Sequence, residues 1–290
     1  MKNYLRILGA VSIWAIINGL VIKGVHASPT AIGFWMGFVG ALLCLVVFIF
    51  NNFKSFRELN KSSCLLLILL GAAAGVNNVF FYVAIKMNEV ANVALIHYVA
   101  QPIAVFWLVW LLKEKLTKQH IAAMVLGFIG LTVLVWKNGG ITFELWLLFA
   151  LFSAFFYSWE IFFSRKLGVE NIDPMLSASS KLIFQMMAMS VGAVIFSQSL
   201  AVSHTSLWQL LVAGALLFVS FVWVFRGLMT VSGRDFSIMG YVDRLGAVLI
   251  GILVFGESLT WQKLVGGGLI LLAQAIVLFA RTKSKNNAPN

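Results

Sequence analysis

Apolar residues run along this chain in long stretches separated by short polar segments. Ten of these stretches approach the roughly 20 residues that a helix needs to cross the hydrocarbon core of a bilayer. Their approximate limits are 5–23, 31–50, 64–85, 91–112, 119–137, 144–164, 175–197, 207–230, 236–255 and 263–281. The pattern therefore predicts an all-α integral membrane protein with ten transmembrane helices and no inserted soluble domain.

The second half of the chain repeats the first at a constant spacing, the repeat offset. Tyr98 recurs as Tyr241, Glu114 as Glu257 and Gln119 as Gln262, and the differences 241 − 98, 257 − 114 and 262 − 119 are equal. This offset is close to half the length of the chain. It is far longer than the roughly 20 to 50 residues of a solenoid period and indicates the internal repeats of membrane transporters. We predict two five-helix repeats, 1–140 and 141–282, followed by a short disordered cytoplasmic tail, 283–290.

Both copies carry one motif, a tyrosine followed further along by a lone glutamate and Leu-Thr. It comprises Tyr98, Pro102, Glu114, Leu116 and Thr117 in the first copy and Tyr241, Glu257, Leu259 and Thr260 in the second. The motif resembles the EamA-type branch of the drug/metabolite transporter superfamily. The second copy departs from the family, with Leu245 where proline is usual and Asp243-Arg244 just before it. The resemblance covers nearly the whole chain and implies a fold and a transport mode, not a substrate.

Composition excludes a soluble protein. Apolar residues make up 61% of the chain and charged residues 11%, too few to coat a globule of this size. The net charge of +11 would suggest nucleic-acid binding in a soluble chain. Here the lysines and arginines lie at the ends of apolar runs, so we expect a lipid bilayer as partner and no nucleic acid.

The same cations predict an orientation, because lysine and arginine are enriched in cytoplasmic loops. A cytoplasmic N-terminus places fourteen of them inside, namely Lys2, Arg6, Lys54, Arg57, Lys61, Lys113, Lys115, Lys118, Arg165, Lys166, Arg234, Arg281, Lys283 and Lys285. Four remain outside, namely Lys23, Lys86, Lys137 and Lys263. We therefore expect a multi-pass protein of the inner (plasma) membrane with both termini cytoplasmic. Five helices per half, an odd number, make the repeats inverted.

The polar residues that need explaining lie inside the apolar stretches. The sequence shows no metal-ligand spacing, phosphate loop or acid-base constellation, which argues against an enzyme, a cofactor or a metal site. An ionisable group at bilayer depth costs at least about 2.5 to 3.5 kcal/mol and is a functional candidate. Glu160, Lys181, Asp243 and Arg244 are such groups, and they occur only in the second half. These two acids and two bases either bind a zwitterion or neutralise one another as structural ion pairs.

The family resemblance implies a substrate cavity between the halves, lined by the first, third, fourth, sixth, eighth and ninth helices. Carried onto this chain, it implicates Trp14, Asn18, Asn77, Asn78, Tyr82, His97, Tyr98, Gln101, Tyr157, Glu160, Trp223, Tyr241 and Asp243, to which charge adds Lys181 and Arg244.

Several of these residues have two interpretations. His97 either titrates in response to a proton gradient or is a hydrogen-bonded packing residue. Asn77 and Asn78 bind substrate or join helices, while Glu114 and Glu257 are expected to bond backbone amides or nearby cations at helix ends. Pro102 should bend the fourth helix and is a candidate gate hinge.

These observations predict a secondary transporter that moves a small polar metabolite, favoured to be an amino acid or similar zwitterion, by alternating access. Coupling to protons and exchange for a counter-substrate both remain open. Alternatives are exchange of S-adenosylmethionine or another charged metabolite, efflux of cationic drugs and, from a different class, a non-transporting membrane scaffold.

Overall fold

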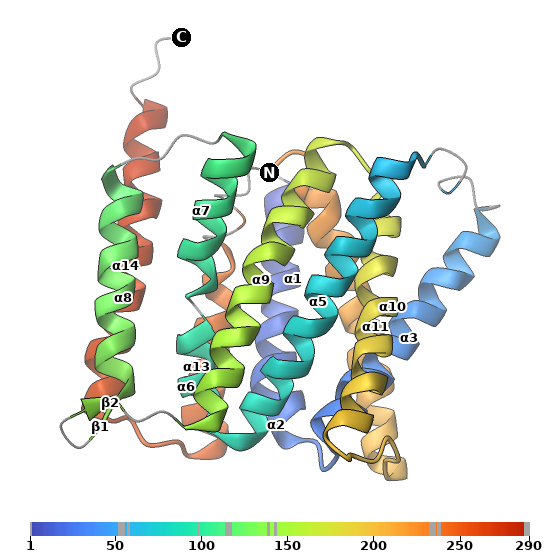
Figure 1. Cartoon of the computed structure of the whole chain (residues 1–290), viewed down its shortest axis with the longest axis horizontal. Coiled ribbons are helices and arrows are strands. Elements are labelled where there is room, and N and C mark those ends of the chain that lie inside the picture. The colour runs from blue at the N-terminus through green and yellow to red at the C-terminus, as the bar shows by residue number, and fades with distance from the viewer. Residues whose placement is uncertain are drawn as a thin grey trace.

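The protein, as a computed structural model, is a bundle of helices (Figure 1). The structure describes residues 2–286 apart from 52–55, 57–58, 98, 114–117, 138–139, 142–143, 232–235 and 237–238. The first half contains α1 (Lys2–Ile16), η1 (Ile17–Val21), α2 (Ile22–Gly24), α3 (Pro29–Phe50), α5 (Lys61–Met87), α6 (Val90–His97), α7 (Ala100–Leu112) and α8 (Lys118–Val135). The second contains α9 (Leu145–Val169), α10 (Pro174–Ile195), α11 (His204–Leu228), α13 (Tyr241–Phe255) and α14 (Trp261–Asn286). Between them, β1 (Trp136–Lys137) pairs antiparallel with β2 (Gly140–Ile141).

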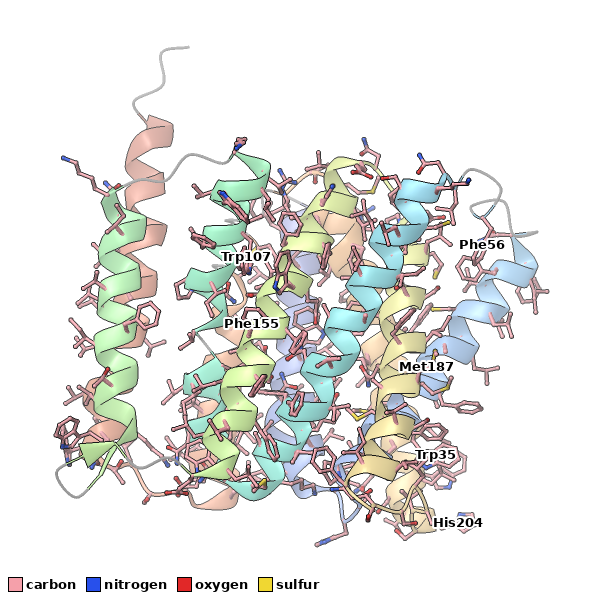
Figure 2. All side chains as sticks on the ribbon, viewed as in Figure 1. Trp35, Phe56, Trp107, Phe155, Met187 and His204 are labelled. Carbon is pink, nitrogen blue, oxygen red and sulfur yellow. The ribbon has the colours of Figure 1, made fainter. Side chains whose placement is uncertain are left out.

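The outer surface of the bundle is apolar. Phe50 is 82% exposed and Val194 81% exposed, and Met187, labelled in Figure 2, is 51% exposed on α10. In the described part of the chain, seven helical stretches are long and apolar enough to cross a membrane, and two shorter apolar helices follow at Gly246–Phe255 and Trp261–Ala273. The chain is therefore a multi-pass membrane protein, and the predicted count of ten spans stays a prediction.

The helices of the two halves correspond in position. In the second half α9, α11 and α14 begin one repeat offset after α1, α5 and α8, since 145 − 2, 204 − 61 and 261 − 118 are equal. The packing follows the same correspondence, because α1 contacts α11 and α13 of the other half while α9 contacts α5 and α7. Like helices also pair, α3 with α10 and α8 with α14, the latter two standing together at one edge in Figure 1. The interior of the bundle is thus built from both halves.

Local sequence explains where several helices begin. Ser28 accepts a hydrogen bond from the Ala31 amide at the start of α3, and Asp173 accepts one from Met175 at the start of α10. A proline follows each cap, at a position whose missing N–H costs no helical bond. Once begun, α3 and α10 approach closely, since a Cβ on Gly37 would lie 2.9 Å from the Met186 nitrogen.

Two predicted helices are interrupted. The first contains five π-helical residues, Ile17–Val21, between α1 and α2. The fourth, predicted as one helix over 91–112, is divided into α6 and α7, with His97 ending the one and Ala100 beginning the other. The sequence suggested that Pro102 bends the middle of a helix, and the structure shows that it does not. It lies in the first turn of α7, where an N–H has no helical partner to lose.

Two lysines cap helix ends at the side of the bundle that we call the far side, meaning the end that contains Lys23, Asn88 and Glu257. The Lys23 ammonium donates to the carbonyls of Ile85 (3.1 Å) and Asn88 (2.8 Å), which end α5. Lys86 in turn donates to the carbonyls of Lys23 (3.3 Å) and Val25 (2.7 Å), which end α2. Carbonyls without helical partners are satisfied by these cations.

The last helix is longer than expected. It continues to Asn286, past the predicted limit of 281, so the first part of the predicted tail is helical. The rest of that tail, 287–290, lies outside the described residues.

Candidate functional site: a polar cavity between the two halves

A cavity lies in the interior of the bundle, between helices of both halves. Its empty volume, counted with its mouth, is about 450 Å³. It is lined by Trp14, Ile17, Asn18, Asn77, Asn78, Phe81, Tyr82, His97, Tyr157, Glu160, Lys181, Gln185, Leu217, Phe221 and Asp243. These residues come from α1, η1, α5, α6, α9, α10, α11 and α13, so α10 joins the six helices that the family resemblance implied.

An ion pair forms the centre of the polar lining. The Lys181 ammonium on α10 lies 2.5 Å from Glu160 Oε1 on α9, and both side chains are only 5% exposed. Each side chain compensates the charge of the other. Either charge would be costly if it were buried alone. The structure thus brings together two of the four charges that the sequence singled out, and it joins them to each other.

Asn77 on α5 connects this pair to two further side chains. Its amide nitrogen donates to Glu160 Oε2 at 3.2 Å, while its amide oxygen accepts from the Ser153 hydroxyl at 2.8 Å. His97 Nε2 lies 3.1 Å from the same oxygen. Because that oxygen only accepts, His97 must carry a proton on Nε2. The His97 ring contacts the rings of Phe81 and Tyr157, at centroid distances of 4.5 and 4.8 Å.

Lys181 also faces two aromatic rings. Its nitrogen lies 3.9 Å from the centroid of Phe221 and 5.4 Å from that of Trp14, distances typical of cation–π interactions. The two rings meet edge to face at 5.6 Å, and the indole N–H of Trp14 donates to the Ser220 hydroxyl at 2.8 Å. The positions of both rings are therefore fixed by contacts other than the lysine.

A second acid enters the cavity from α13. Asp243 is 1% exposed, and its Oδ1 accepts from the amide of Asn18 at 2.9 Å. Asn18 lies in the π-helical segment, where the extra residue per turn changes the direction of side chains, a feature frequent at functional sites. The irregular backbone of the first half thus positions the partner of an acid from the second.

A smaller set of hydrogen bonds joins α5, α10 and α3 along one wall. The Asn78 amide donates to Gln185 Oε1 at 2.8 Å, and the Gln185 amide donates to the Gly33 carbonyl at 3.0 Å. Each amide has a protein partner here, which supports the helix-joining interpretation of Asn78.

Ten of the predicted site residues line the cavity, namely Trp14, Asn18, Asn77, Asn78, Tyr82, His97, Tyr157, Glu160, Lys181 and Asp243. Trp223 does not, because its ring packs over Gly9, where a Cβ would lie 2.7 Å away. Gln101 is also buried away from it, in the first turn of α7, and its Oε1 has no hydrogen-bond partner among the described residues. Tyr98 and the side chains of Tyr241 and Arg244 lie outside the described part of the chain.

The sequence prediction omitted five lining residues, Ile17, Phe81, Gln185, Leu217 and Phe221. Two kinds of signal would have found some of them. Phe81 and Gln185 lie one helical turn after Asn77 and Lys181, so they share a face with them. Ile17 and Phe221 are the counterparts of Glu160 and Asn78 at the repeat offset (160 − 17, 221 − 78).

Glu257 lies outside the cavity, at the far side, and has the role expected from sequence. Its carboxylate accepts from the backbone amides of Val90 (2.5 Å) and Ala91 (3.0 Å), which begin α6. Lys263 lies 3.8 Å from this carboxylate and 2.8 Å from that of Glu89. An acid of the second half thus caps a helix of the first, while Glu114, its counterpart, lies outside the described residues.

No group of three or more His, Cys, Asp or Glu side chains that could hold a metal occurs in the described part of the chain.

Comparison with known proteins gives one family. Residues 1–136 and 144–279 each match the model of the EamA-like transporter family. A protein of Archaeoglobus fulgidus described as an uncharacterized transporter is 28% identical over 199 residues, covering 66% of this chain and 68% of that protein. A protein of known crystal structure has the same fold, with a TM-score of 0.68 at 16% identity over 97% of this chain and 98% of the other.

Proposed function

The chain belongs to the EamA-like transporter family, and on that premise we propose that it moves a small polar solute, favoured to be an amino acid or similar zwitterion, through the cavity around Glu160 and Lys181. The observation that carries this proposal is the buried ion pair at the edge of a cavity. A zwitterion carries the same two charges, a positive one that can pair with Glu160 and a negative one that can pair with Lys181. Its binding therefore leaves no charge of the pair buried and uncompensated.

Alternating access of two inverted five-helix repeats is the mechanism we propose. It is supported by the matching spacing of the helices and by the way α1 and α9 each pack against the other half. In Figure 1, α1 runs down the bundle whereas its counterpart α9 runs up it. Rocking of one half against the other would expose the cavity to each side in turn.

The position of the transporter follows from charge. We propose the inner (plasma) membrane, with both termini in the cytoplasm and the far side facing outward. Pro102 stays our candidate for a gate hinge, now because it follows the break between α6 and α7. Transport by Pro102→Ala at the wild-type rate would remove it from that role.

A second candidate is the efflux of organic cations. The two acids and the aromatic rings of Trp14 and Phe221 favour it, since such groups attract ammonium and sulfonium ions. The Lys181 ammonium disfavours it, because a cation without an anionic group would meet a like charge. S-adenosylmethionine, which combines a sulfonium with an amino-acid group, fits either candidate.

Transport in liposomes tests the proposal. Purified protein is reconstituted and supplied with radiolabelled amino acids, either against an imposed pH gradient or into vesicles preloaded with unlabelled amino acids. We expect uptake of at least one amino acid in one of the two modes, and at least a tenfold lower rate for Glu160→Gln. Glu89→Gln, which removes a carboxylate at the far side, should transport as the wild type does. Absence of uptake in both modes would contradict the proposal.

A further inference from the structure

The surroundings of the Lys181 ammonium resemble a binding site for an organic cation. One side is a carboxylate, Glu160 Oε1 at 2.5 Å, and another is the face of Phe221 at 3.9 Å, with Trp14 further out at 5.4 Å. Proteins bind free ammonium ligands with this combination of an acid and aromatic faces. Here the cation that fills the site belongs to the protein itself.

The walls of this site do not depend on the lysine. Trp14 is held by its hydrogen bond to Ser220 and its edge contact with Phe221. The second oxygen of Glu160 is held by the amide of Asn77. The lysine, by contrast, is a flexible chain of four methylenes that adjoins the cavity. Its ammonium can therefore move while the walls keep their geometry.

We propose that Lys181 occupies the ammonium subsite of the empty transporter and is displaced from it by the amino group of the substrate. This inference rests on the proposed function and assigns the two ends of the zwitterion. The substrate ammonium takes the place beside Glu160 and Phe221, and the displaced Lys181 ammonium pairs with the substrate carboxylate. Both new contacts are ion pairs, so the number of paired charges in the cavity rises by one of each sign.

The exchange makes Lys181 a specificity residue. A simple amine that enters the subsite displaces the lysine without offering it an anion, so the buried Lys181 ammonium loses the carboxylate of Glu160 and gains none from the ligand. An amino acid restores that partner. Discrimination against amines thus comes from an unfavourable state of the protein and not from poor contacts with the amine.

Pairs of ligands that differ only in the carboxylate test this inference. The probes are leucine with isoamylamine and phenylalanine with phenethylamine, and affinity is measured from thermal stabilisation of the purified protein. In Lys181→Met, which keeps an unbranched side chain one atom shorter and removes its charge, we expect the affinity for amines to rise at least tenfold. Lys61→Met, which removes an exposed lysine at the start of α5, should leave it unchanged.

The increase in affinity for amines must depend on the Glu160 carboxylate. The double variant Glu160→Gln, Lys181→Met should therefore not show this increase. Should Lys181→Met fail to fold, Lys181→Gln replaces it, because its amide can still donate to Glu160 without carrying charge. An affinity for both amines within threefold of the wild type in the neutral variant would overturn the inference. Failure of the proposed function gives a different result. In that case the wild type neither binds nor transports any amino acid, while Lys181→Met or Lys181→Gln can still gain affinity for amines.

Discussion

Asn77 shows how much one buried amide can organise. Through its two polar atoms it contacts Glu160, Ser153 and His97, which belong to α9 and α6. Asn77 is 4% exposed, so these hydrogen bonds lie largely away from bulk water. Asn77 thereby holds the carboxylate of Glu160 in the position from which it meets Lys181.

Replacing Asn77 by alanine should therefore destabilise the protein. The substitution leaves three buried polar groups short of a partner, and each such group costs about 1 to 3 kcal/mol, so we expect a loss of at least about 2 kcal/mol in the free energy of unfolding. Asn92→Ala is the control, because within the described part of the chain the Asn92 amide donates to near neighbours, Asn88 and Glu89, at the start of α6. Thermal unfolding in detergent measures both. An equal effect of the two substitutions would show that Asn77 has no special role.

At the residue scale, the sequence predicted which charged residues lie in the cavity better than it predicted which way a side chain points. Glu160, Lys181 and Asp243 were identified because charge is costly in an apolar helix, and all three line the cavity. Trp223 lies outside the lining of the cavity for a geometric reason. It lies two residues after Phe221, and two helical residues turn through about 200°, so it points to the opposite face. Partners on other helices, such as Ser220 for Trp14, follow only from packing in space.

At the scale of elements, two equivalent helices end in the same backbone conformation. Lys113 after α7 has a φ of 56°, and Gly256 after α13 has a φ of 65°. The two positions are separated by the repeat offset (256 − 113), so the repeat preserves a left-handed helix end. Only the second copy has the residue that adopts this conformation without strain.

Exchanging the two residues should have opposite effects on stability. Lys113→Gly removes the strain and should raise the free energy of unfolding by about 1 kcal/mol. Gly256→Lys should lower it by about the same amount, because no described residue beyond its two chain neighbours lies within 4 Å of a Cβ there, and the backbone conformation decides. Chemical or thermal denaturation in detergent provides the measurement. A loss of stability in Lys113→Gly would contradict this explanation of the helix end.

The positions of most helices were predictable from hydrophobicity, whereas their interruptions were not. Residues 91–112 are mostly apolar, and the few polar residues among them, Asn92, His97 and Gln101, do not by themselves mark an end between α6 and α7. The π-helical segment could not be predicted from the sequence either, because one extra residue per turn leaves the composition of the segment unchanged. Pro102 gave a partial signal for the break, but it marked the first turn of α7 and not the bend itself.

At the scale of the whole molecule, the cations that oppose the predicted orientation have structural partners. Lys23 and Lys86 cap each other's helices, and Lys263 pairs with Glu89 and Glu257. Three of the four lysines on the predicted outer side are thus accounted for by contacts at the far side. The charge bias of the remaining cations is then a clearer indicator of topology than the raw count.

Cysteine labelling tests this topology. In a variant whose own thiols are removed (Cys44→Ala, Cys64→Ser), a single cysteine replaces either Lys61, at the start of α5, or His204, at the opposite end of the bundle (Figure 2). A membrane-impermeant thiol reagent added to intact cells should label His204→Cys at once. It should label Lys61→Cys only after the cells are permeabilised. The reverse pattern would invert our orientation, and labelling of both from outside would contradict opposite sides.

The most direct test of the account is whether a zwitterion binds at Glu160. Thermal stabilisation of the purified wild type and of Glu160→Gln is measured against amino acids, S-adenosylmethionine and quaternary ammonium compounds. We predict that an amino acid or amino-acid-like solute stabilises the wild type, by about 2.7 kcal/mol at a hundredfold excess over Kd, and that Glu160→Gln shows no shift at the same concentration. Stabilisation by quaternary ammonium compounds alone, or equal stabilisation of the two proteins by the amino acid, would contradict the account.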